Sequence, residues 1–179
     1  LELAPDFTRA RRNYPQLLSK RERLEEALTQ VDALLAAEPN RYPLLTLQAS
    51  IYVKLGDFAR GIAVYERLLR QFPPRPMTTL VYGHALKTIG RQAEAIDAYR
   101  RTIALQPSFG DAYWSLANLK TFRFEEGDIA VMRGQIDSAA GTLEDHFHLR
   151  FALGKALEDR GEYAESFEHY LRGNAIKIE

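Results

Sequence analysis

His146 and His148 are a pair of side chains that could bind a metal ion together. They follow Glu144 and Asp145 in the stretch EDHFHLRF, and zinc in proteins is commonly held by histidine and carboxylate ligands. On a helix, residues two positions apart do not face each other, and no second pair four positions apart supports this one. We therefore interpret both histidines as residues at the start of a helix and predict no metal site.

The remaining candidates for catalysis are scattered along the chain. His84 and His169 stand alone on expected helices, and the sequence places no serine or carboxylate beside either. Glu125, Glu126 and Asp128 suit the start of a helix, where the macrodipole favours negative charge. Cysteine is absent, which excludes a thiol nucleophile, and no phosphate-binding loop of the G-x-x-x-x-G-K type occurs. We predict no catalytic, cofactor-binding or metal-binding residue in this chain.

The charge balance gives no reason to expect nucleic acid or a membrane as a partner. The 179 residues hold 24 basic and 24 acidic side chains, although residues 42–109 carry 9 basic against 4 acidic and residues 110–179 carry 8 against 13. No apolar run approaches the ~20 residues of a membrane span, and no signal peptide is recognisable, so we expect a cytoplasmic protein. The sequence opens on LELAPDF without a methionine, and we expect a fragment of a longer chain.

Prolines reveal the elements that position these side chains. Four of them are spaced 34 residues apart and each follows an apolar helical run: Pro5, Pro39, Pro73 and Pro107. Proline cannot continue a helix and disfavours the helical conformation of the residue before it. A period of 34 is typical of arrays in which each repeat is a pair of helices.

Other residue types keep the same period. Small residues recur where two helices would cross, at Ala49, Gly83, Ala117 and Gly154 in first helices and at Gly61, Ala95 and Ser166 in second helices. Large rings recur beside them at Tyr65, Tyr99 and Tyr170, and the turns hold Gly56, Gly90 and Gly161. Small side chains let two helices approach closely, and glycine accepts the positive φ that often follows a helix.

This pattern resembles the tetratricopeptide repeat over almost the whole chain. The resemblance implies an all-α fold, a right-handed α-α superhelix of about five helix-turn-helix repeats. We expect repeats at 42–75, 76–109 and 147–179, degenerate repeats at 8–41 and 110–146, and the tail of an earlier repeat at 1–7. In the repeat 8–41, Pro15 replaces the small residue, so we expect the first helix to break or restart there.

The repeat 110–146 is three residues too long. We expect its first helix to span Gly110 to Phe122 and Asp128 to cap the second helix, because aspartate is a favoured N-cap residue. Between them, Phe122 and Phe124 either fill the gap left by the missing tight turn or form an exposed aromatic shelf for a partner. For the acids Glu158 and Asp159, at the end of an expected helix, the sequence offers no explanation, since negative charge is unfavourable there.

Two phrases carry a further resemblance. NLKTFRF and FALGKALED are similar to the repeats that precede the catalytic domain of bacterial tetratricopeptide-sulfotransferase proteins. That resemblance implies a parent that transfers sulfuryl groups from 3′-phosphoadenosine 5′-phosphosulfate (PAPS), with the enzyme domain beginning soon after Glu179. The repeats themselves would be catalytically silent.

The family resemblance also implies a binding surface. First helices of tetratricopeptide repeats line a concave groove, and here its expected residues are Lys54, Leu80, His84, Lys87, Trp114, Asn118, Phe122, Phe151 and Lys155. Such a groove suits an extended peptide with acidic and aromatic or aliphatic side chains. The alternative is that Trp114 and Phe151 pack on neighbouring helices. The carboxylate clamp of chaperone-binding relatives is not expected, because Asn118 has no matching Asn or Arg in the other repeats.

Three functions are consistent with these residues. The first is a scaffold that binds a protein or peptide and orients it for an attached domain. The second is a fragment of a sulfotransferase whose catalytic domain lies beyond residue 179. The third is a structural array that associates end to end, because Leu1–Pro5 and the apolar Ile176 and Ile178 look like uncapped ends.

Overall fold

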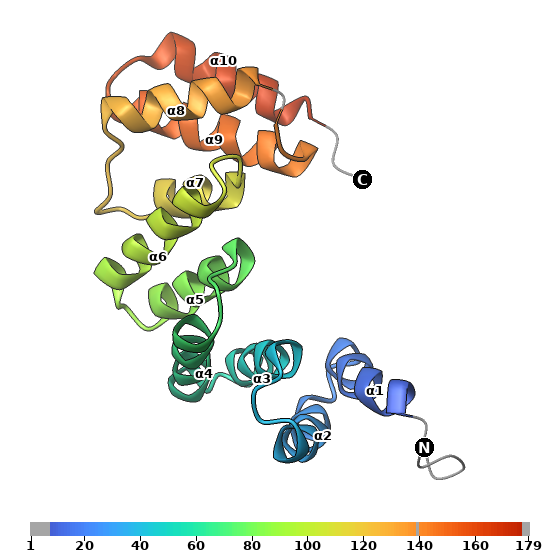
Figure 1. Ribbon diagram of the computed structural model, residues 1–179. Coiled ribbons are helices and arrows are strands. Elements are labelled where there is room, and N and C mark those ends of the chain that lie inside the picture. Colours follow the sequence, from blue (N-terminus) through green and yellow to red (C-terminus); the bar gives the residue numbers. More distant parts are fainter. Residues whose placement is uncertain (1–7, 139, 177–179) are drawn as a thin grey trace. The chain divides into compact units, whose positions relative to one another are not determined.

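Helices are the only regular elements in the residues that the structure describes. A computed structural model describes residues 8–138 and 140–176, with side chains from Asn13 onward. Ten helices follow one another in this range (Figure 1): α1 (Thr8–Lys20), α2 (Leu24–Ala37), α3 (Tyr42–Lys54), α4 (Phe58–Gln71), α5 (Pro76–Thr88), α6 (Gln92–Leu105), α7 (Gly110–Ala117), α8 (Glu126–Asp137), α9 (Leu143–Asp159) and α10 (Tyr163–Asn174). The all-α prediction is confirmed. The predicted tail at 1–7 and Ile178 lie outside the described residues.

The 34-residue period marks the ends of helices. Helices α2, α4 and α6 end two residues before Pro39, Pro73 and Pro107 respectively. The turn glycines adopt the predicted left-handed conformation, with φ of 79° at Gly56, 81° at Gly90 and 79° at Gly161. These positions are therefore set by the local chain, because proline stops a helix and glycine tolerates positive φ.

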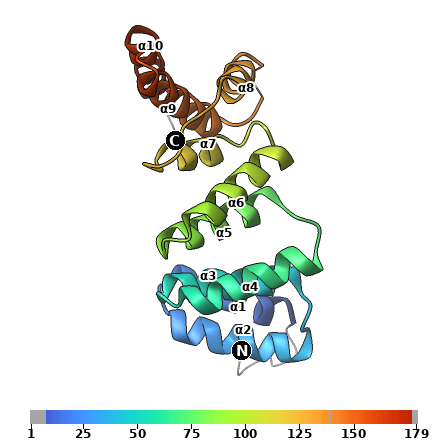
Figure 2. The same ribbon diagram turned by 90° about the vertical axis from the view of Figure 1, so that its left-hand side faces the viewer.

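Helix packing divides the chain into two compact parts. The first part comprises Leu1–Pro74 and His84–Arg91, and the second comprises Arg75–Gly83 and Gln92–Glu179. In the first part, α2 packs between α1 and α3, and α3 packs on α4. In the second part, α9 lies against α7, α8 and α10 (Figure 2). Its core consists of Tyr113, Ile129, Met132, Leu149, Ala152, Leu153, Ala156 and Leu157.

Glycine and tyrosine meet where helices cross in the second part. A Cβ added to Gly83 would lie 2.7 Å from the ring of Tyr99, and one added to Gly154 would lie 2.8 Å from the ring of Tyr170. Both distances are shorter than real Cβ contacts, so only glycine admits the ring. The predicted pairing of a small residue with a large ring is confirmed at these two crossings.

The predicted break at Pro15 is wrong. Helix α1 runs from Thr8 through Pro15 to Lys20 without interruption. An interior proline removes one backbone hydrogen bond and typically costs about 3 kcal/mol. Pro15 is buried, as are Ala49 and Gly83 at the matching positions of later repeats. Packing of α1 on α2 therefore compensates for the lost hydrogen bond.

The first helix of the odd repeat is shorter than predicted. Helix α7 ends at Ala117, five residues before Phe122, because the amide Nδ2 of Asn118 donates to the carbonyl of Trp114 at 2.9 Å. This bond satisfies one of the carbonyls at the end of the helix. Leu119 then turns inward and is buried.

The predicted N-cap at Asp128 is wrong by three residues. Helix α8 begins at Glu126 with Glu125 as its N-cap residue. Asp128 lies in the first turn, where its Oδ2 accepts from the backbone N–H of Glu125 at 3.0 Å. The same carboxylate accepts from the Nη2 of Arg100 at 3.0 Å. Asp128 therefore both stabilises the start of α8 and ties it to α6.

Phe122 and Phe124 pack together in the long link between α7 and α8. Their ring centroids are 4.9 Å apart in an edge-to-face arrangement, and both side chains are half-buried. Phe124 packs against the core of the second part, and the guanidinium of Arg100 lies 5.1 Å from the centre of the Phe122 ring. The structure favours packing over an exposed shelf for this pair, although Phe122 keeps part of its ring exposed.

Glu22 offers a test of the turn geometry. It occupies the position of Gly56 and Gly90 in the first repeat and has a φ of 57°, which is unfavourable for a side chain with a Cβ. Among the described residues its carboxylate pairs with Lys54 at 3.0 Å, and this ion pair is exposed. We expect Glu22→Gly to raise the free energy of unfolding by about 0.5–1 kcal/mol in urea titrations followed by circular dichroism. Gly56→Ala is the matched control and should lower the free energy of unfolding. A loss of stability in Glu22→Gly would show that the positive φ of Glu22 is not unfavourable.

Candidate functional site

A single carboxylate places helix α9 beside helix α7. Thr142 is the N-cap residue of α9, and Asp145 in the first turn completes the cap: its Oδ2 accepts from the backbone N–H of Thr142 at 2.9 Å and its own N–H donates to the Thr142 hydroxyl at 3.1 Å. Its Oδ1 accepts from the backbone N–H of Gly110, the first residue of α7, at 2.9 Å. The two helix starts are thus joined through one side chain. His146 and His148 lie in the first two turns of α9, as predicted.

Four aromatic rings gather on the helices that Asp145 aligns. We call Trp114 of α7, Phe147 and Phe151 of α9 and Tyr170 of α10 the aromatic cluster. Phe151 is its centre, with ring centroids at 5.7 Å from Trp114, 4.7 Å from Phe147 and 5.7 Å from Tyr170. All four side chains are half-buried, so each packs on its neighbours and still reaches solvent. Aromatic pairs at such distances contribute about 0.5–1.5 kcal/mol beyond the burial of their area.

Glycines make room for the rings of the cluster. A Cβ on Gly173 of α10 would lie 2.7 Å from the ring of Phe151, just as one on Gly154 would meet Tyr170. The hydroxyl of Ser166 donates to the carbonyl of Gly154 at 2.7 Å and holds α10 against α9. The small residues at 154 and 166 were predicted to let the two helices approach closely. The role of Gly173 was not predicted.

The acids at the end of α9 have partners in the folded chain. The hydroxyl of Tyr170 donates to Oε2 of Glu158 at 2.9 Å. Burial, followed by this hydrogen bond, raises the pKa of Tyr170 above its ordinary value. Asp159 pairs with Lys155 one turn earlier and lies 3.6 Å from the Nε of Arg123. These contacts offset the unfavourable interaction of two acids with the helix C-terminus.

The predicted groove residues fall in both parts of the chain. Lys54, His84 and Lys87 belong to the first part and the others to the second. Leu80 is only 2% exposed, so its side chain belongs to the core. Contrary to the prediction, it is not available to a partner. Lys87 is exposed, whereas Lys54 pairs with Glu22.

The second part brings together some of its predicted residues. Trp114 and Phe151 are in direct contact, which fits the interpretation that they pack on neighbouring helices. Asn118 is exposed at the end of α7, and Lys155 lies one turn beyond Phe151 on α9. Phe147 was missed, although its spacing of four residues from Phe151 puts both rings on one face of a helix. The four-residue spacing could have identified Phe147 as a neighbour of Phe151 from the sequence.

Neither a metal-binding cluster nor a membrane-spanning helix occurs among the described residues. Within residues 8–138 and 140–176, no group of three or more histidine, cysteine, aspartate or glutamate side chains is placed to hold a metal ion. Over the same range, no helix is long and apolar enough to cross a membrane. The aromatic cluster exposes part of its apolar ring surface beside the polar side chains of Asn118 and Lys155.

His169 gives the second part a dependence on pH. Burial lowers the pKa of His169, and the positive charge of Arg150 lowers it further, against the opposing effect of Glu165 at 3.7 Å. The unfolded chain therefore takes up a proton at higher pH than the folded chain, and stability falls as pH falls through the ordinary histidine pKa of about 6.5. We expect a lower urea midpoint at about pH 5.5 than at about pH 7.5, read from the fluorescence of the single tryptophan, Trp114. His169→Gln should reduce this difference, and an unchanged difference would exclude His169 as its source.

Comparisons with known proteins agree on the fold. A family model described as tetratricopeptide repeat matches residues 16–76 and 46–108, which together are more than half of the chain. The protein CTR9 homolog of Arabidopsis thaliana is 27% identical over 139 residues, which are 77% of this chain and 12% of that protein. The chain thus spans about an eighth of the length of this relative.

Two solved structures share the arrangement of helices. MamA (residues 41 to the end) from Desulfovibrio magneticus RS-1 superimposes with a TM-score of 0.68 and 21% identity, covering 96% of this chain and 95% of that one. YrrB, described as a tetratricopeptide repeat protein with an unusual peptide-binding site, gives a TM-score of 0.64 and 16% identity, covering 92% and 84%. At these identities the likeness concerns the fold alone.

Proposed function

Because this chain belongs to the tetratricopeptide repeat family, we propose that it is a scaffold that binds an extended peptide or protein segment at the aromatic cluster. The observation that supports this most directly is that four rings from three helices meet and all remain partly exposed. A surface that only stabilised the fold would gain more by burying them, since each buried ring removes apolar area from water. Exposed aromatic residues are the usual anchors of protein interfaces.

The chemistry beside the cluster suggests the type of ligand. An aromatic or aliphatic side chain of the ligand would lie against Trp114 and Phe151. A neighbouring carboxylate of the ligand would compete with Asp159 for the ammonium of Lys155. Asn118 would be available to bond the ligand backbone, since its side-chain carbonyl is not used in capping α7. The expected ligand is therefore an extended segment that alternates apolar and acidic side chains.

The test is a screen of displayed peptides followed by affinity measurements on variants. We expect Trp114→Ala to weaken binding of a selected peptide by about ten-fold or more, because removal of an aromatic anchor commonly costs 2 kcal/mol or so. Val131→Ala is the control, since Val131 is an exposed apolar side chain on α8 that is not in the cluster. Equal affinity of wild type and Trp114→Ala would exclude the cluster as the binding site.

The first part has its own proposed contact residues. Lys54, His84 and Lys87 remain predicted groove residues, and Lys87→Ala tests them separately from the aromatic cluster. If a selected peptide loses affinity only in Lys87→Ala, binding occurs in the first part and the proposal for the cluster fails.

A second candidate function concerns the protein from which this chain derives. The segments Asn118–Phe124 and Phe151–Asp159 carry the resemblance to the repeats of bacterial sulfotransferases. In such a cytoplasmic bacterial protein the scaffold would orient a peptide for an attached domain that uses PAPS. The coding sequence downstream of Glu179 tests this, because a strand followed by a phosphate-binding loop has to appear there.

A further inference from the structure

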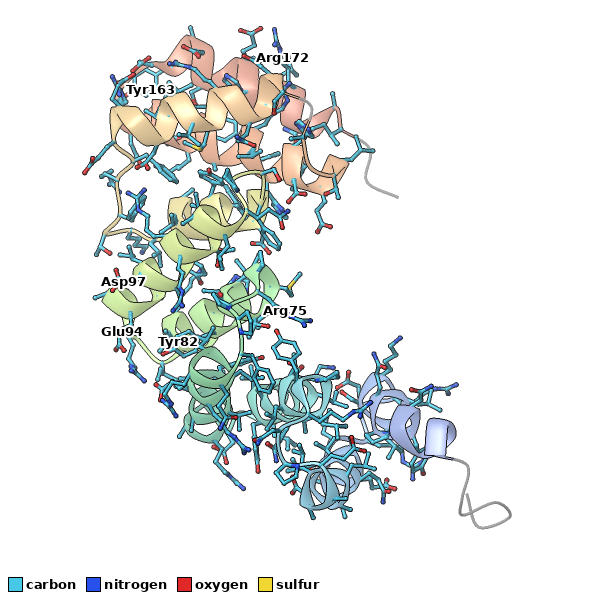
Figure 3. All side chains as sticks on the ribbon, in the orientation of Figure 1. Arg75, Tyr82, Glu94, Asp97, Tyr163 and Arg172 are labelled. Atoms are coloured by element: carbon cyan, nitrogen blue, oxygen red, sulfur yellow. The ribbon has the colours of Figure 1, made fainter. Side chains whose placement is uncertain are left out.

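Asp159, the last residue of α9, is shared by two cations. It lies four residues before Tyr163, whose label in Figure 3 marks the start of α10. Its Oδ1 pairs with the ammonium of Lys155, and its Oδ2 lies 3.6 Å from the Nε of Arg123 in the long link between α7 and α8. The side chain of Asp159 is only 19% exposed, and a carboxylate so far removed from water is costly to leave unpaired. With two cations beside it, Asp159 keeps a partner even if one of them turns away.

Lys155 is the cation that a ligand at the aromatic cluster can reach. It lies one turn beyond Phe151 on the same helix, and its side chain is 33% exposed. Its pair with Asp159 is poorly placed, because a lysine four residues before an acid is the less favourable order on a helix. The negative charge of Asp159 is also unfavourable at the C-terminal end of α9. Lys155 can therefore leave Asp159 at a small cost, provided that Asp159 stays neutralised.

Arg123 is held beside Asp159 by the link that carries it. Its Nη1 donates to the backbone carbonyls of Lys120 at 3.1 Å and of Phe122 at 2.7 Å. The ring of Phe122 packs edge-to-face on Phe124, which rests on the core of the second part. The guanidinium is thus positioned by its own segment and does not depend on Lys155 for its place next to Asp159.

We propose that Arg123 gives the aromatic cluster a preference for acidic peptides, an inference that rests on the proposed binding of a peptide there. When the peptide binds, the ammonium of Lys155 turns from Asp159 to a carboxylate of the peptide. Arg123 keeps Asp159 neutralised, so this exchange leaves no unpaired carboxylate behind. Without Arg123, Asp159 would retain Lys155 and repel the incoming carboxylate. Arg123 is therefore a residue that determines specificity, although it lies outside the cluster.

Two forms of one peptide test this role of Arg123. The probe is a fluorescently labelled peptide selected from the displayed library, synthesised with glutamate or with glutamine at its acidic positions. Fluorescence anisotropy gives the dissociation constant of each form, and the glutamine value divided by the glutamate value is the acid preference. We expect an acid preference of about five-fold for wild type, as for a well-formed exposed ion pair, and of less than about two-fold for Arg123→Gln. Lys120→Gln removes one exposed positive charge from the same link and should keep the wild-type preference.

Asp159→Asn separates this mechanism from a general loss of positive charge. The amide no longer competes for Lys155 as a carboxylate does, so Asp159→Asn should have an acid preference at least as high as that of wild type. In this background Arg123→Gln should have almost no effect, since no carboxylate remains for Arg123 to neutralise. An equal loss of acid preference in both backgrounds would mean that Arg123 acts by general attraction, and would overturn the proposal. Circular dichroism checks that all variants are folded.

Trp114→Ala distinguishes failure of this inference from failure of the proposed function. If the peptide binds wild type and Trp114→Ala equally well, the aromatic cluster is not the binding site and both proposals fail. If Trp114→Ala weakens binding but wild type shows no acid preference, or Arg123→Gln retains it, the cluster binds peptides and only the role of Arg123 is excluded. Selection of peptides without acidic residues would exclude that role as well.

Discussion

Replacement of Gly110 by alanine is expected to destabilise the second part of the chain by about 3 kcal/mol, the upper end of the usual cost of overpacking. A Cβ at this position would lie 2.1 Å from the carbonyl oxygen of Asp145 and 2.8 Å from its carbonyl carbon and Cα. These are backbone atoms of α9, so no side chain can rotate to relieve the clash. Helices α7 and α9 would have to separate, and the hydrogen bond from Gly110 to the Asp145 carboxylate would weaken.

The measurement is urea unfolding followed by tryptophan fluorescence, because Trp114 lies on α7 itself. Gly127→Ala and Gly134→Ala are matched controls within α8, since a Cβ at either position meets nothing within 4 Å. Alanine is a better helix former than glycine by about 1 kcal/mol, so the controls should be neutral or more stable than wild type. A Gly110→Ala variant as stable as the controls would show that α7 and α9 are not held this closely. Because α7 and α9 carry Trp114 and Phe151, the same variant should also weaken peptide binding at the aromatic cluster.

The second large effect is expected for Tyr99→Ala. This change should lower the free energy of unfolding by about 4 kcal/mol, as the removal of other large aromatic side chains from a core does. Tyr99 is fully buried, and its ring rests directly on the backbone of Gly83. Removal of the ring leaves a cavity that the helices can fill only by shifting toward each other, and close-packed interiors relax only partially.

The control for Tyr99→Ala is Tyr163→Ala at low protein concentration. Tyr163 is an exposed tyrosine in the same part of the chain, and its replacement should change the free energy of unfolding by less than about 0.5 kcal/mol. The converse change, Gly83→Ala, should destabilise wild type and be better tolerated when Tyr99 is replaced by leucine. Simple additivity of the two changes would contradict the direct contact of residue 83 with the ring.

Features that depend on a few neighbouring residues were determined by the sequence alone. The prolines at 39, 73 and 107 predicted the ends of α2, α4 and α6, and the glycines at 56, 90 and 161 predicted the turns. A proline or a positive φ acts on its own part of the backbone, whatever packs around it. The periodic pairing of small residues with tyrosines likewise predicted which rings lie at the helix crossings.

Errors arose where the local preference was outweighed by packing or by a competing hydrogen bond. Pro15 should end a helix, but burial of its ring against the first part's helices keeps α1 continuous. Asn118 ends α7 early because its side chain competes for the Trp114 carbonyl. Asp128 has the chemistry of a capping residue, but Glu125 caps α8, while Asp128 contacts Arg100. The burial of Pro15 and the contact of Asp128 with Arg100 depend on partners far away in the sequence, whereas the bond of Asn118 to Trp114 is local and was overlooked.

The aromatic cluster was decided by tertiary structure. Trp114 and Phe151 were predicted separately, and nothing in the sequence joined them to Tyr170, which is 56 residues beyond Trp114. Their contact requires α7, α9 and α10 to approach closely, and this depends on Asp145 bridging two helix starts and on Gly154 and Gly173 accepting rings. The sequence thus determined the repeat, because its signals act locally. Only the packed structure decided which rings meet, because their distances depend on several helices at once.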